Sequence, residues 1–228
     1  MSTNMRNDIK TLAYVLRRTN YGEADRIINL ITPEGKMSAI ARGVRKEKSK
    51  LAGGIEMFSL IELNINRGKS ELGVVTSARM LKYYDKLLMD FRRMELAALI
   101  LKHVSMMAES SDSPEYFKLV DQGLAGLNAG LNVDLVESWF WLNLMKVSGE
   151  EINLYRDADG QKLIPENKYM WDVMAAAFAR SEQGDFGADE IKMLRLIAST
   201  DLGVVGRVKN IDIMMPKILW LIRKVSKI

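Results

Sequence analysis

The spacing of apolar residues changes near residue 84, and this change constrains the fold more than any other feature of the chain. Before it, short runs of β-branched and apolar residues are separated by turn sequences at 20–22 and 32–35, which is typical of strands and hairpins. After it, apolar residues recur at spacings of three and four, beginning over 87–110, which is typical of helices that bury one face. The chain of 228 residues is therefore predicted to be an α+β protein, with a β domain at 1–83 and a helical domain at 84–228.

The β domain is predicted to contain five strands. They cover Thr11–Arg17, Asp25–Ile31, Lys36–Ala41, Ile55–Asn66 and Glu71–Ser77. Five short strands in a domain of this size are what a Greek-key barrel of the OB type requires. Periodicity does not distinguish this barrel from an SH3-like one, so both remain open at this point.

The second domain is predicted to be all-helical. Ser113 is placed as the N-cap of one helix, with Pro114 in its first turn. Three glycines within 123–130 are interpreted as a helix end or a close helix crossing, because no strand precedes them as a phosphate loop would need. The remaining helices are predicted over Leu87–Ser110, Val133–Val147, Pro165–Ser181, Ala188–Ser199 and Met214–Ser226.

Charge is distributed unevenly along the chain. Residues 1–83 carry 15 basic and 8 acidic residues, 84–201 carry 12 and 20, and 202–228 carry 6 and 1. The densest positive stretch lies between the third and fourth predicted strands, where nine residues from Arg42 to Lys50 hold five cations and one acid. Cations beside a barrel groove neutralise phosphates without reading sequence. This predicts a polyanion-binding domain, with ordinary surface solvation as the alternative.

The counts of reactive residue types exclude many functions. With no cysteine and one histidine, His103, the chain has no disulfides, no thiolate nucleophile and no multi-His or Cys-based metal site. His103 and the aromatic run 139–141 lie on apolar helix faces and are interpreted as core. No catalytic residue, metal or cofactor is predicted. No apolar stretch is long enough for a membrane span, so a soluble cytoplasmic protein without a membrane partner is expected.

Three segments resemble the N-terminal signature of the recombination mediator RecO family. They are Tyr21–Asp25, Thr32–Lys36 and Ala41–Lys46, and Phe58 stands where that family usually keeps an aromatic residue. The resemblance implies an OB-fold domain followed by a helical domain, binding of single- and double-stranded DNA, and promotion of strand annealing. It also implies cooperation with RecR in loading the RecA recombinase onto strands coated by single-stranded DNA-binding protein.

The resemblance implies a further partner surface on the helical domain. In the family, the acidic, apolar-ended C-terminal tail of single-stranded DNA-binding protein docks on this domain. Candidates to receive its acids here are Lys209, Lys217, Arg223 and Lys224, with ordinary solvation of a helix surface as an equal alternative.

One segment departs from the family pattern. Many RecO proteins carry a four-cysteine zinc site in the helical domain, whereas Arg156 and Asp159 stand here at the places of the first two cysteines. The loop near 152–164 is therefore predicted to hold without zinc, with an Arg156–Asp159 ion pair as a candidate substitute.

The same loop partly matches a calcium-binding pattern. Asp157, Asp159, Gly160 and Glu166 fall at the third, fifth, sixth and twelfth places of an EF-hand-like loop. The first place is Tyr155, which lacks the required carboxylate. A plain Asp-Gly turn is therefore favoured over a calcium site.

The predicted function is that of a non-enzymatic, DNA-binding recombination mediator. Two alternatives remain: a metal-dependent nuclease or hydrolase using Asp157 and Asp159, and an OB-type RNA-binding protein. A two-metal site needs several converging carboxylates, and no strand-borne cluster accompanies these two acids. The predicted DNA contacts are Arg42, Arg45, Lys46, Lys48 and Lys50, with Lys36 at the preceding turn and Arg17, Arg18 and Arg26 on the first two strands.

Overall fold

The computed structural model describes residues 8–67, 72–108 and 113–226. Its contacts divide the chain into two compact units, Met1–Asn128 and Ala129–Ile228. The predicted change of period near residue 84 marks the end of the first five strands, but the first two α-helices after it belong with those strands to unit 1.

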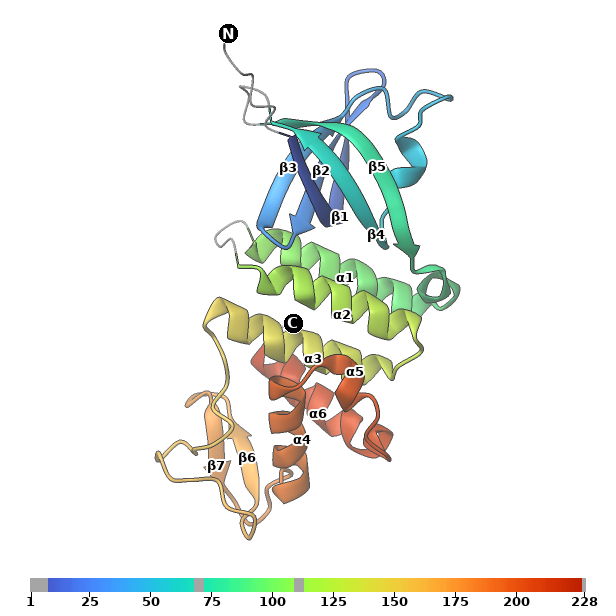
Figure 1. The fold of residues 1–228 in the computed structure, drawn as a ribbon. Coiled ribbons are helices and arrows are strands. Elements are labelled where there is room, and N and C mark those ends of the chain that lie inside the picture. Colours follow the sequence, from blue (N-terminus) through green and yellow to red (C-terminus); the bar gives the residue numbers. More distant parts are fainter. Residues whose placement is uncertain (1–7, 68–71, 109–112, 227–228) are drawn as a thin grey trace. The chain divides into compact units, whose positions relative to one another are not determined.

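The first unit contains a closed five-stranded barrel. Its strand order is β1-β2-β3-β5-β4, with β3 and β5 parallel and the other neighbours antiparallel (Figure 1). This confirms the predicted α+β fold with an N-terminal OB-type barrel. The strands are β1 (Asp8–Tyr21), β2 (Asp25–Thr32), β3 (Gly35–Ala41), β4 (Ser59–Asn66) and β5 (Gly73–Tyr83).

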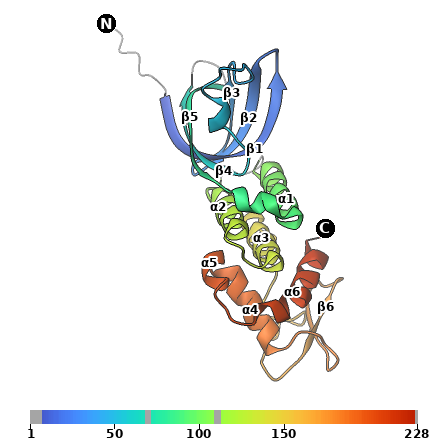
Figure 2. The ribbon, with the colours of Figure 1, turned by 90° about the vertical axis from the view of Figure 1, so that its right-hand side faces the viewer.

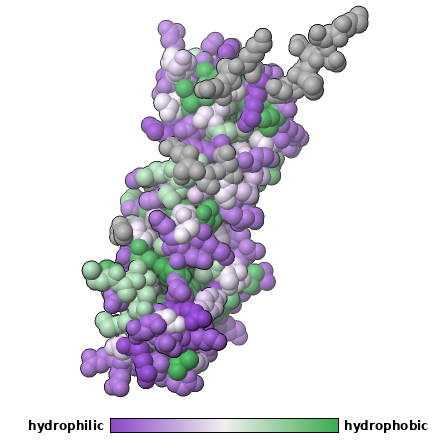
Figure 3. All heavy atoms as spheres, turned by 90° about the vertical axis from the view of Figure 1, so that its left-hand side faces the viewer, coloured by the Kyte–Doolittle hydropathy of each residue, from purple (hydrophilic) through white to green (hydrophobic). Residues whose placement is uncertain are grey.

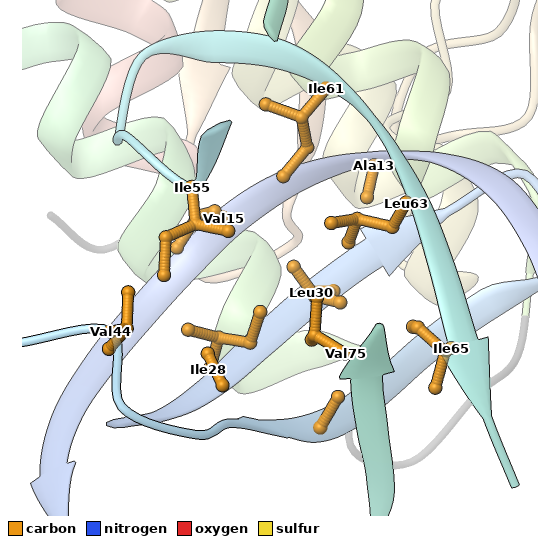
Figure 4. Close-up of a cluster of buried hydrophobic side chains, with 12 residues drawn as sticks. Ala13, Val15, Ile28, Leu30, Val44, Ile55, Ile61, Leu63, Ile65 and Val75 are labelled. Atoms are coloured by element: carbon orange, nitrogen blue, oxygen red, sulfur yellow. The ribbon is translucent and has the colours of Figure 1, made fainter. Parts of the chain in front are cut away.

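The barrel core follows from strand alternation. On β4, Ile61, Leu63 and Ile65 are buried while the residues between them are half-buried, as expected for one face turned inward. Figure 4 shows these side chains meeting residues from β1, β2 and β5 inside the barrel. Val44 and Ile55 join this cluster from the connection between β3 and β4, so that connection is anchored by its own apolar side chains.

Two helices complete unit 1. They are α1 (Phe91–Met107) and α2 (Glu115–Asn128), preceded by the short 3-10 helix η2 (Asp85–Met89). A Cβ on Gly123 of α2 would lie 2.9 Å from the Ile100 side chain of α1, which confirms the predicted close helix crossing.

A buried polar network ties the barrel to α2. The Tyr14 hydroxyl donates to Asp121 at 2.5 Å and lies 2.9 Å from the Tyr84 hydroxyl. Burial, followed by the hydrogen bonds to Asp121 and Tyr84, raises the pKa of Tyr14 above its ordinary value. The raised pKa favours the neutral hydroxyl, the form that donates to Asp121.

The second unit is built around one central helix. Its elements are α3 (Val133–Ser148), β6 (Tyr169–Asp172), β7 (Ala177–Arg180), α4 (Ala188–Ser199), α5 (Leu202–Val205) and α6 (Ile211–Val225). The helix α3 packs against α4 and α6 (Figure 2). Residues 139–141 of α3 are all buried, as predicted for a core rather than a base-stacking surface.

The predicted helix over Pro165–Ser181 is wrong. This segment forms the antiparallel hairpin β6–β7, so unit 2 is not all-helical. Tyr169 and Trp171 are buried on one face of the hairpin, and the Asp172 carboxylate accepts hydrogen bonds from two backbone N–H groups in the turn. Packing of the aromatic side chains therefore overrides the helix propensity of the Ala-rich stretch 174–177.

The loop at the place of the family's zinc site is held by a turn. The Asp157 carboxylate accepts hydrogen bonds from the N–H groups of Asp159 at 3.1 Å and Gln161 at 2.8 Å, and Gly160 has φ of 77°. The predicted Asp-Gly turn is confirmed. Arg156 donates to the Gly160 carbonyl at 2.7 Å and does not form the candidate ion pair with Asp159.

This turn leads to a prediction about metal. We expect the purified protein to contain no stoichiometric zinc, and we expect a chelator to leave its melting temperature unchanged, because hydrogen bonds of Asp157 and Arg156 close the loop. Elemental analysis and thermal unfolding with and without EDTA test this. One zinc atom per chain, or a lower melting temperature in EDTA, would contradict it.

The described part of the chain shows neither a membrane span nor a metal cluster. None of its helices is both long and apolar enough to cross a membrane. Within the same residues, no three His, Asp or Glu side chains gather as ligands for a metal ion. The face drawn in Figure 3 is mostly hydrophilic, with hydrophobic side chains in separate small patches.

Candidate nucleic-acid interface

The basic segment 42–50 begins where β3 ends and is fixed against the turn between β1 and β2. The Gly43 N–H donates to the Asp25 carboxylate at 2.7 Å, and the Arg45 N–H donates to the Ala24 carbonyl at 2.9 Å. Val44 between them is buried in the barrel core. The backbone of the loop is therefore held in place while its charged side chains remain outside.

The five cations of this loop are exposed: Arg42, Arg45, Lys46, Lys48 and Lys50. Arg45 also donates to the Gly22 carbonyl at 3.3 Å. None of the five forms an ion pair with another residue in the described ranges. Their charges therefore remain available to phosphates from solution.

The ribbon of β1 and β2 continues this basic surface. A hollow of about 420 Å³ at its end is lined by Leu16, Arg17, Arg18, Asn20, Arg26 and Met57. Arg18 donates to Glu56 at 2.8 Å, and Arg26 donates to Asn20 at 3.1 Å, so both guanidinium groups are oriented. The arginines on its walls suit the phosphates of a nucleic-acid strand.

Strand pairing brings the hollow and the basic loop to the same end of the barrel. Arg26 pairs with Ala41, the residue that immediately precedes Arg42. A shift of register between Val15 and Arg17 interrupts the alternation of β1 where its two arginines begin. Arg17, Arg18 and Arg26 therefore line one hollow, and the basic loop begins beside it.

Among the predicted DNA contacts, Lys36 lies apart from both the hollow and the basic loop. It lies at the start of β3, at the far end of that strand from Arg42, and its ammonium donates to the Ser105 carbonyl of α1 at 2.7 Å. Lys36 therefore helps to attach α1 to the barrel, and we leave it out of the proposed interface.

The sequence prediction missed an aromatic residue at this surface. Tyr21, the last residue of β1, is 55% exposed and directly precedes Gly22, whose carbonyl accepts from Arg45. An exposed ring among cations is a platform on which a base can stack. The position of Tyr21 in the predicted turn could have indicated its exposure, because a side chain in a turn usually lies outside the core.

The single histidine lies apart from this surface. His103 is half-buried on α1. Burial, and then the neighbouring charge of Lys102, lowers the pKa of His103 below its ordinary value. His103 is thus half-buried at the edge of the packed face of α1, not in the core as predicted.

Comparisons with known proteins agree with this architecture. A family model described as "Recombination protein O N terminal" matches residues 5–84, which include the whole barrel. The DNA repair protein RecO of Heliobacterium modesticaldum is 30% identical over 210 residues, covering 86% of this chain and 76% of that protein.

Two further relatives carry the same name. RecO of Dehalococcoides mccartyi is 29% identical over 213 residues, which cover 89% of this chain and 83% of that protein. RecO of a Roseiflexus species is 33% identical over 150 residues, 65% of this chain and 53% of that protein. With the barrel matched by the family model and relatives aligned over 86–89% of the chain, the chain belongs to the DNA repair protein RecO family.

Proposed function

We propose that this chain is a non-enzymatic recombination mediator that binds single- and double-stranded DNA at the basic end of its barrel and promotes strand annealing. Membership of the RecO family assigns it to DNA repair and recombination. The observation that supports the finer proposal is an exposed loop with five cations that begins beside a hollow lined by Arg17, Arg18 and Arg26 on an OB-type barrel.

The chemistry of this surface favours contacts to the nucleic-acid backbone. Lysine and arginine side chains on a short loop neutralise phosphates, and this contribution is independent of sequence. Neutralised strands repel each other less, so complementary bases can approach and pair. The basic loop suits the backbone of either DNA form, and the exposed ring of Tyr21 suits an unpaired base.

We further propose the partners that the family resemblance implies. Acting in the cytoplasm, the chain would work with RecR to load RecA onto strands coated by single-stranded DNA-binding protein. The acidic tail of that protein requires a surface with both apolar and cationic groups. Two of the lysine and arginine residues first considered for it are already paired, Lys217 with Glu190 and Arg223 with Glu137, each at 2.7 Å.

A larger hollow in unit 2 suits this tail better. It measures about 530 Å³, and Leu142, Ile152 and Leu154 supply apolar lining. Three cations line the same hollow, Lys146, Arg156 and Arg195, against one acid, Glu151. Arg195 is oriented by a 2.9 Å hydrogen bond to the Leu154 carbonyl. We therefore propose this hollow as the docking site for the tail.

Incubation with labelled complementary oligonucleotides separates a mediator from a nuclease. We expect pairing without strand loss in magnesium or manganese, and we expect the same pairing in EDTA, because phosphate neutralisation by side chains needs no metal. Loss of full-length strands that depends on the metal would instead support the nuclease. Competition with RNA oligonucleotides tests the third alternative, since an RNA-binding protein would prefer them to DNA.

A further inference from the structure

One tryptophan of unit 2 is exposed. The chain has four tryptophans. Trp139, Trp141 and Trp171 are 3%, 4% and 8% exposed, whereas Trp220 on α6 is 51% exposed. A large aromatic ring that stays in solvent is not explained by core packing.

The surroundings of Trp220 are cationic. The Lys224 ammonium lies 5.6 Å from the centroid of its ring, within the range of a cation–π contact. A shallow hollow of about 350 Å³ beside the ring is lined by Pro216, Leu219, Trp220, Arg223 and Lys224, all of which belong to α6. The segment 202–228 that contains this helix has six basic residues and one acidic residue.

We propose that this surface of α6 is a second contact for single-stranded nucleic acid, with a base stacked on Trp220 and a phosphate on Lys224. The inference rests on the proposed function and extends it to unit 2. Positive charge in this segment complements a polyanion, and stacking on an exposed ring is the usual way in which unpaired bases are held without sequence preference.

The shape of the hollow favours a nucleic acid over a peptide. An apolar side chain of a peptide gains affinity when several elements enclose it, but every lining residue here lies on a single helix. A stacked base needs only one open ring face. The acidic tail discussed above is therefore assigned to the larger hollow, and this surface to a strand.

A second contact has a direct consequence for annealing. With one strand on the barrel of unit 1 and another on α6 of unit 2, a single molecule can carry both strands that are to be paired. Tethering two sites in one chain raises the local concentration of one strand near the other.

Intrinsic fluorescence tests the proposal, because the other three tryptophans are buried. The experiment uses the full chain with Arg42, Arg45 and Lys46 replaced by alanine, so that binding at the barrel does not mask the second contact. We expect oligo(dT) to quench the fluorescence. Trp220→Phe should abolish the quenching and keep the affinity within about twofold, since a ring remains. Trp220→Ala should weaken binding at least about fivefold.

Matched controls separate stacking from general charge effects. Met174→Ala removes another exposed apolar side chain of the same unit, 96% exposed, and should change nothing. An abasic oligonucleotide has the phosphates without the bases and should not quench. If oligo(dT) leaves the fluorescence unchanged, or if an acidic peptide ending in phenylalanine quenches it and DNA does not, the inference is overturned. The proposed function would still stand if the wild-type chain anneals DNA and the barrel variant does not.

Discussion

Replacing Arg42, Arg45 and Lys46 together by alanine is expected to weaken single-stranded DNA binding for every sequence tested. If about four cations of the basic loop meet phosphates, the logarithm of the affinity should fall with the logarithm of salt at a slope near −3, from roughly 0.7 per contact. Losing three contacts should flatten that slope by about two and lower the affinity on the order of 100-fold at 0.1 M salt. Fluorescence anisotropy across a salt series measures both quantities.

Annealing should decline in parallel, since bringing two strands together depends on the same cations. Lowering the salt concentration should partly restore both DNA binding and annealing in the triple variant. Loss of a catalytic residue would not be restored in this way. The matched control replaces three exposed cations of unit 2, Lys162, Lys168 and Arg180, with the same change in net charge and no expected effect on the slope. If the loop variant is folded and keeps both affinity and slope, DNA binds elsewhere.

The barrel was predictable from sequence because its signals are local. Turn sequences separate each pair of strands from β1 to β3, and β4 alternates regularly, so the strands require no knowledge of distant contacts. The helix Ala188–Ser199 was predicted with the bounds that the structure has. The hairpin β6–β7 was missed because its stability comes from rings that are brought together only in the folded unit.

The candidate interface was predictable only in part, for a related reason. The cations of the basic loop are neighbours in sequence, and their density is visible directly. Lys36 is only six residues from Arg42, but an extended strand separates the two by about 20 Å. Conversely, Arg26 reaches the loop through its pairing with Ala41, which sequence spacing does not reveal. The exposure of Trp220 also depends on which face of α6 is covered by the rest of unit 2. Because both faces of this helix carry apolar residues, apolar periodicity does not identify the covered face.

The hairpin region poses the question of what stabilises the segment at which the family resemblance implies a zinc site. Phe178 of β7 is fully buried. The centroid of its ring lies 5.3 to 6.4 Å from the ring centroids of Trp171, Phe186 and Tyr169. Its carbonyl accepts a hydrogen bond from Ala158 at 2.7 Å. One residue therefore joins the Asp157 turn, the hairpin and the segment that leads into α4. Packed rings can supply the cross-link that a metal supplies elsewhere, because aromatic pairs add attraction beyond the area that they bury.

Phe178→Ala is accordingly expected to destabilise unit 2 by about 3–5 kcal/mol, the usual cost of removing a buried aromatic ring. Urea unfolding monitored by circular dichroism measures the loss, and hydrogen exchange should show that residues 156–180 open first. Phe178→Leu keeps most of the volume and should cost less than about 1.5 kcal/mol, while Met174→Ala at the exposed turn should cost nothing measurable. DNA binding by the barrel belongs to unit 1 and should persist in the Phe178→Ala variant. If that variant is as stable as the wild type, the ring cluster does not hold the hairpin, and a source of stability other than aromatic packing must replace the metal.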